Sequence, residues 1–145
     1  MARTAKEIFD IAIHLIDAQN ESNGNTETAD TKEYLLRTPS LLNSILNRAY
    51  PYSDTYTPVA EKRPVHPKLE APSDLVEMDD YICLSVLPYG LASLLVNPEG
   101  DSAIASFLWQ MFEEGLMTAR NSLPSSVEPI ESAYGGLEYG WFSKW

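Results

Sequence analysis

One segment of the sequence has the residue types and the spacing of a metal site. Asp10, His14 and Asp17 stand at positions i, i+4 and i+7, so a helix there would carry all three on its narrow polar face. Carboxylate oxygens and imidazole nitrogens are common ligands of divalent metals. We favour a solvated face on which the carboxylates flank His14, because no cysteine or second histidine lies nearby to complete a site. The sequence thus predicts neither a metal nor another cofactor.

A second pattern, Glu113-Glu114, resembles a pair of catalytic carboxylates. Neighbouring residues on a helix point about 100° apart, so these two side chains are poorly placed to act on one substrate atom. The sequence has no Glu-x-x-His motif of a di-iron bundle, and it lacks a phosphate-binding glycine loop, GxSxG, HExxH and CxxC. We therefore predict a solvated face at this position and a protein that is not an enzyme.

The composition narrows the classes of partner. The 145 residues carry a net charge of −11, and the isoelectric point is near 4.4. Direct binding of DNA or RNA needs clustered lysine and arginine, so the charge argues against it, although an acidic wall would let a duplex slide past without sticking. The single cysteine, Cys83, excludes an intramolecular disulfide and fits a reducing compartment. The opening residues lack the apolar run of a signal peptide, which favours intracellular synthesis.

The element that would position the rest of the chain is the uncharged stretch 81–96. Its leucines recur with the spacing of a helix, and the stretch is apolar on nearly all sides, which predicts a buried central helix. Pro88 removes one backbone donor, so we expect a kink there, and Gly90 would let a neighbouring helix come close. The stretch is shorter than the ~20 residues that a bilayer requires.

Three further helices are expected around it. The capping box of Thr4 and Glu7 predicts a helix from there to about residue 20. A helix over 31–50 contains Pro39, so it either kinks or restarts there. A helix over 102–121 follows turn residues at 97–100. Its expected apolar stripe consists of Ile104, Phe107, Leu108, Met111 and Phe112.

Segment 51–77 is rich in proline and predicts a long loop or arm, with short strand pieces at most. It also holds the one locally basic stretch of the chain, formed by Lys62, Arg63, His66 and Lys68. That stretch is either a nucleic-acid patch or a solvated loop that pairs with the acidic remainder. The predicted fold is an all-α bundle of about four helices, two of them kinked at proline, in a domain 1–121 that includes this arm.

The segment 122–145 is predicted to be an extended docking tail, because aromatic residues alternate in it with glycines. Such a tail either folds back on its own bundle or docks on another subunit; left uncovered, it would be a liability. The residues expected to contact a partner are Tyr134, Leu137, Tyr139, Trp141, Phe142 and Trp145, followed by Tyr52 and Tyr56.

Several motifs taken together resemble the small helical head–tail connector, or neck adaptor, proteins of tailed bacteriophages and prophages. The matching pieces, in chain order, are the opening AKEIFDIAIHLID, Tyr34-x-x-Arg37-x-Pro39 with Leu41-Leu42-Asn43, the core Leu87-Pro88-Tyr89-Gly90-Leu91-Ala92, segment 107–114, and the closing Tyr134-Gly135-Gly136-Leu137-Glu138-Tyr139-Gly140. The set touches most of the chain except 51–72, and its order along the chain is the specific part of the match.

This resemblance implies a non-enzymatic virion component that assembles as a ring between portal and tail. Its partners would be the portal protein and neighbouring neck or tail proteins, with no sequence-specific nucleic-acid binding and no membrane. The expected location is the host cytoplasm during assembly and then the neck of the virion. An alternative of another class is an acidic, DNA-mimic-like inhibitor that sequesters a basic protein, which salt would displace.

Overall fold

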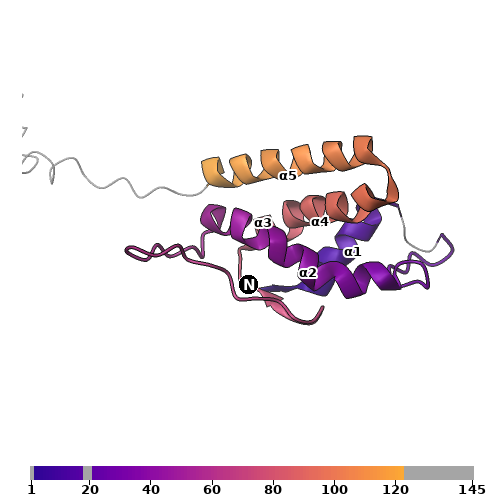
Figure 1. Cartoon of the computed structure of the whole chain (residues 1–145), viewed down its shortest axis with the longest axis horizontal. Coiled ribbons are helices and arrows are strands. Elements are labelled where there is room, and N and C mark those ends of the chain that lie inside the picture. Colours follow the sequence, from indigo (N-terminus) through magenta and orange to yellow (C-terminus); the bar gives the residue numbers. More distant parts are fainter. Residues whose placement is uncertain (1, 18–20, 123–145) are drawn as a thin grey trace, which may run out of the picture.

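The computed structural model describes residues 2–17 and 21–122, and the part of the chain that it describes is a small, mostly helical bundle (Figure 1). The predicted all-α class is confirmed at this level. In chain order the elements are β1 (Arg3–Thr4), α1 (Ala5–Leu15), α2 (Lys32–Ala49), the 3₁₀ turn η1 (Tyr50–Tyr52), β2 (Leu75–Val76), α3 (Asp80–Ser85), α4 (Leu87–Val96), the 3₁₀ turn η2 (Asn97–Glu99) and α5 (Ser102–Ser122).

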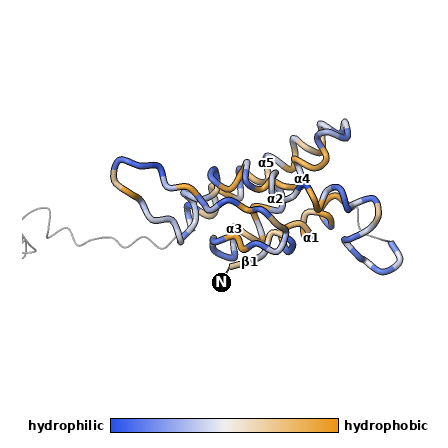
Figure 2. Tube along the Cα trace, turned by 60° about the horizontal axis from the view of Figure 1, so that its bottom comes forward, coloured by the Kyte–Doolittle hydropathy of each residue, from blue (hydrophilic) through white to orange (hydrophobic). Residues whose placement is uncertain are grey.

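Helix α4 is the centre of the bundle. It packs against α5, α1 and α2, and Figure 1 shows α5 lying along one side of the molecule over α4. Leu87, Leu91 and Leu95 of α4 are fully buried. Figure 2 shows many of the hydrophobic residues gathered in this central region, while the two long loops are largely hydrophilic. The core therefore forms around the stretch whose sequence is apolar on nearly all sides.

The predicted central helix is divided into α3 and α4 at Val86, whose backbone angles (φ −121°, ψ −57°) are not helical. Pro88 lies in the first turn of α4, a position where its missing donor costs little. By length and composition the segment Asp80–Glu99 is long enough to cross a membrane, so the expectation that it is too short is wrong by that measure. Over half of the tested window is nevertheless buried inside the bundle, as in the core helix of a water-soluble protein.

At Gly90, side chains of α2 and α5 lie very close to the backbone of α4. A Cβ atom at this position would lie 2.9 Å from the Ile45 side chain of α2 and 2.9 Å from the Phe112 ring of α5. Any side chain here would force those neighbours apart, because real Cβ contacts are essentially never so short. The glycine therefore permits the close packing of three helices that the sequence suggested.

Helix α1 begins as predicted and ends earlier than predicted. Thr4 Oγ1 accepts a hydrogen bond from the Glu7 amide at 3.2 Å, which confirms the N-cap. The helix stops at Leu15 rather than near residue 20, since Asp17 adopts a left-handed conformation with φ 55°. Aspartate tolerates that region better than most residues and so can end a helix.

The N-terminus forms a small antiparallel pairing that the sequence did not indicate. Arg3 of β1 lies opposite Val76 of β2, and Thr4 lies opposite Leu75. The Arg3 guanidinium also donates to both carboxylate oxygens of Asp80 at 3.1 and 3.2 Å. This pair ties the chain start to the N-terminus of α3, where a negative charge is favourable.

The arm between η1 and α3 is fastened to α2 by two asparagines one helical turn apart. The Asn43 side chain donates to the Leu69 carbonyl and accepts from the Leu69 amide, both at 2.8 Å. Asn47 accepts from the His66 amide at 2.9 Å. The side chain of His66 is itself buried, and its Nε2 accepts from the Glu77 amide at 2.8 Å. The part of the arm that lies on the bundle is thus held by directed polar contacts.

Helix α5 buries a face that coincides only in part with the expected one, since Leu108 and Phe112 are buried as predicted. Its buried residues are Ala105, Leu108, Phe112, Leu116 and Ala119. Ile104 and Phe107, which the sequence placed in the core, are 48% and 61% exposed. The prediction was wrong for these two because it weighted large apolar residues, whereas the small residues Ala105 and Ala119 occupy buried positions of α5.

Candidate interaction surface

The largely apolar groove beside α5, here called the α5 groove, is the best candidate for an interaction site in the described residues. Its volume is about 480 Å³, and it lies between the end of α2, η1 and the C-terminal half of α5. It is lined by Tyr52, Trp109, Phe112, Leu116 and Met117, with Arg48 and Glu113 as its charged residues. An apolar floor with a polar rim is the usual anatomy of a protein-binding surface.

The aromatic floor of the groove is fixed by neighbouring side chains. The rings of Trp109 and Phe112 lie 4.9 Å apart at an angle of 41°. Arg48 lies over the indole of Trp109 at 5.4 Å, in cation–π geometry. The indole N–H donates to the Glu113 carboxylate at 2.8 Å. The indole is therefore held from two sides, and the groove presents one cation and one carboxylate beside an aromatic surface.

Predicted contact residue Tyr52 lies in this groove, whereas Tyr56 does not. The ring of Tyr56 meets the ring of Tyr50 edge to face at 5.2 Å, and Tyr50 also meets the His66 ring at 5.9 Å. Tyr56 thus belongs to the base of the arm. The other six predicted contact residues lie outside the described residues; they are Tyr134, Leu137, Tyr139, Trp141, Phe142 and Trp145.

A second cavity, of about 500 Å³, opens near the base of the arm and is lined partly by carboxylates. Two of these carboxylates, those of Asp79 and Asp80, have partners within the fold. Asp79 accepts from the Ser53 hydroxyl at 2.8 Å and caps α3 through the Ile82 amide at 3.3 Å. Asp80 is paired with Arg3, whose hydrogen bond holds the pKa of the Asp80 carboxyl below its ordinary value. The cavity is therefore explained by contacts that build the fold.

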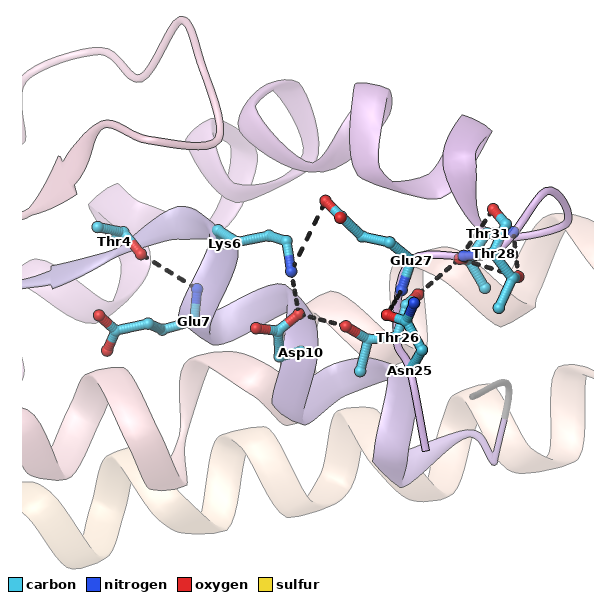
Figure 3. A network of polar contacts seen from close by, with 9 residues as sticks. All are labelled: Thr4, Lys6, Glu7, Asp10, Asn25, Thr26, Glu27, Thr28 and Thr31. Atoms are coloured by element: carbon cyan, nitrogen blue, oxygen red, sulfur yellow. Dashed lines mark hydrogen bonds and ion pairs between the residues drawn. The ribbon is translucent and has the colours of Figure 1, made fainter. Parts of the chain in front are cut away.

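The residues considered for a metal site are engaged elsewhere or separated. Figure 3 shows Asp10 accepting from Lys6 at 2.5 Å and from the Thr26 hydroxyl at 2.6 Å, which ties the loop before α2 to α1. Asp17 lies beyond the end of the helix that carries His14. Within the described ranges 2–17 and 21–122, no group of three metal-binding side chains comes together.

Cys83 lies in the core, fully buried. Its thiol points to the carbonyl oxygens of Met78 and Val76 at 3.5 and 3.9 Å. Burial, helped by the charge of Asp79, raises the pKa of the thiol to about 12. The thiolate form needed of a nucleophile or a metal ligand is thus strongly disfavoured.

Other parts of the described surface also expose apolar side chains, among them the outer face of α5 and the end of the arm. Ile104 and Phe107 stand out from α5, away from the α5 groove. At the end of the arm, Val59 and Val65 are 51% and 64% exposed, close in sequence to the exposed pair Lys62 and Arg63. The basic stretch is therefore split: Lys62, Arg63 and Lys68 are exposed, while His66 is buried against the bundle.

Sequence reasoning missed the α5 groove because its walls come from two helices far apart in the chain. The available signal was the spacing of Trp109, Phe112 and Leu116 on one helical face, next to a tyrosine cluster that follows the other helix. No protein-family model, no curated protein and no solved structure matches this chain. The evidence for a function therefore comes from this chain's own sequence and structure.

Proposed function

We propose that this chain is a non-enzymatic structural component of a tailed-phage virion neck, a head–tail connector that assembles as a ring between portal and tail and lets DNA pass. The observation that supports this most is where the resembling motifs lie. The core motif 87–92 forms the buried start of α4, and segment 107–114 supplies Phe112, which packs against Gly90. The likeness thus concerns residues that determine the fold rather than scattered surface positions.

The net charge of the chain is compatible with a position around a channel through which DNA passes. A net charge of −11 repels the phosphates of a passing duplex, so contact with DNA would be weak and transient. The exposed Lys62 and Arg63 are confined to the arm, which loops out from the end of the bundle at which α5 ends (Figure 1). The locally basic stretch with Lys62, Arg63 and Lys68 on an otherwise acidic chain favours contact with the next acidic copy over contact with DNA.

A closed ring of identical subunits requires two different, complementary surfaces on each copy, because each subunit binds its two neighbours through different surfaces. The projecting arm, with exposed Val59 and Val65, is a candidate for the first. The outer face of α5, with exposed Ile104 and Phe107, is a candidate for the second. The aromatic tail would then be the segment that grips the portal or a neighbouring neck protein.

The proposal is tested by removing the tail. A chain truncated after Ser122 keeps every described helix, so it should fold and yet fail to bind portal-bearing heads in an assembly reaction. The matched control is the full-length chain carrying Asp30→Asn, an exposed change outside all of these surfaces. Assembly that is equally efficient with and without the tail would contradict the proposal.

The acidic inhibitor is the alternative, and the charge of −11 favours it too. It predicts a tight complex with a basic host protein that raised salt dissociates, together with indifference to portal-bearing heads. The same assembly reaction, repeated at low and high salt with the basic fraction of a host lysate as competitor, separates the two functions.

A further inference from the structure

The α5 groove lies next to the point where the described chain ends, and this places a specific occupant within reach. Phe112 and Ser122 are ten residues apart on one helix, which corresponds to about 15 Å along the axis. The polar, proline-containing segment 123–133 would span about 18 Å as a flexible linker. The residues that follow it are the aromatic ones, so their distance from the groove matches the length of the linker.

The chemistry of the groove also matches that segment. The groove offers aromatic and aliphatic side chains at its floor and the charges of Arg48 and Glu113 at its rim. Segment 137–145 carries Trp141 and Phe142 between the opposite charges of Glu138 and Lys144. Large aromatic side chains contribute most of the binding energy in such clefts, and charges at the rim determine orientation.

We propose that in the free chain the aromatic segment 137–145 docks in the chain's own α5 groove, with Trp141 and Phe142 against Tyr52, Trp109 and Met117. The segment then returns antiparallel along α5. Pro124 stands two positions after Ser122, the last residue of α5, where proline is common because it cannot continue a helix. This inference concerns the unassembled chain and does not depend on the neck proposal.

Because the segment is tethered, its effective concentration favours docking in the chain's own groove over docking in the groove of a second copy. With a linker of this length, the effective concentration of the segment at its own groove is about 1 mM. A second copy would have to reach that concentration before exchange of tails could compete. Docking also covers an apolar surface that an isolated soluble chain would otherwise expose. A partner that binds the tail must therefore first displace the tail from the groove. This requirement slows the association of the free chain with that partner.

The test is amide hydrogen exchange on the full-length chain, followed across residues 134–145. Met117→Asp places a charge in the groove at a position that is 48% exposed, so the bundle should stay folded. Ile104→Asp is the matched control: it is also 48% exposed on the same helix, and the two positions point about 140° apart. In the unaltered chain and in the control, the amides of 134–145 should exchange at least about tenfold more slowly than in a free peptide.

Met117→Asp should abolish that protection, and so should the double change Trp141→Ser with Phe142→Ser, which leaves the bundle untouched. Exchange in the unaltered chain as fast as in the peptide would overturn the inference. Equal loss of protection in Met117→Asp and Ile104→Asp would overturn it as well. Protection that appears only as protein concentration rises, together with a doubled mass, would assign the groove to the tail of a second copy and contradict docking within one chain.

Discussion

Gly90 of α4 lies directly against Phe112 of α5: a Cβ atom on the glycine would stand 2.9 Å from the Cδ1 atom of the ring. Phe112 is at the same time part of the floor of the α5 groove. One side chain therefore takes part both in a close contact between α4 and α5 and in the candidate interaction surface. A change in the packing of α4 on α5 should consequently reach the groove.

Gly90→Ala should destabilise the bundle by about 1–3 kcal/mol, because the added methyl group overpacks a filled core. The change would be followed by urea unfolding. Adding Ile45→Val removes the Cδ1 atom that would lie 2.9 Å from that methyl group, so the double variant should lose less stability than the sum of the two single variants. Strictly additive losses would show that the close approach at Gly90 is not the cause.

Asn43→Ala should loosen the arm. Both backbone groups of Leu69 would lose their partner while the residue stays 3% exposed, which costs about 1–3 kcal/mol. Hydrogen exchange of amides 66–70 should accelerate, while the amides of α4 change far less. Ser40→Ala, an exposed change one turn earlier on α2, is the control and should leave exchange in the arm as it was.

Asp80→Asn should lower stability at pH 7, and the loss should shrink as the pH falls. The Arg3 guanidinium holds the pKa of Asp80 below its ordinary value. A carboxylate with a lowered folded pKa stabilises the fold fully above its unfolded pKa of about 3.9, and that contribution disappears as pH drops through the folded value. Urea midpoints at pH 7 and about pH 3 measure the effect.

The control for that experiment is Asp30→Asn, which removes an equal charge from an exposed position. It separates the loss of the Arg3 pair from the relief of general repulsion in an acidic chain. If the two variants respond to pH in the same way, the pair with Arg3 does not account for the pH dependence.

Cys83 should be inert to Ellman's reagent at pH 8 until the protein unfolds. The thiol is fully buried, and its pKa of about 12 leaves almost no thiolate. Its rate of modification should therefore follow the fraction of molecules in which the core is open, and it should rise steeply with urea. A second thiol introduced by Ser106→Cys on the exposed face of α5 should react at once. Rapid modification of Cys83 without denaturant would contradict the burial.

Helical periodicity predicted the described helices well, because each buries one apolar face over several turns. It failed where a few backbone angles decide the outcome. The left-handed Asp17 ends α1 early, and the non-helical Val86 divides the central stretch. Strand β1 is two residues long and forms only because Leu75 and Val76 pair with it. No local sequence pattern indicates this pairing.

The candidate site was predictable only in part. The sequence indicated the aromatic tail and Tyr52 as contact residues, because a dense group of exposed aromatic side chains promotes association unless it is buried against a partner. It did not indicate the α5 groove, since Arg48 and Trp109 meet only after α2 and α5 have packed on the same core. Nor did it show that Ile104 and Phe107 face outward, because their size suggested burial.

The central claim is that this chain is part of a virion neck, and a census of particles tests it most directly. Phage particles from the source bacterium would be purified, and this chain and the portal protein would be quantified by mass spectrometry. The account predicts that the chain is present in a copy number close to that of the portal. Finished particles without the chain, in lysates where the free protein is abundant, would contradict the neck assignment and favour the acidic inhibitor.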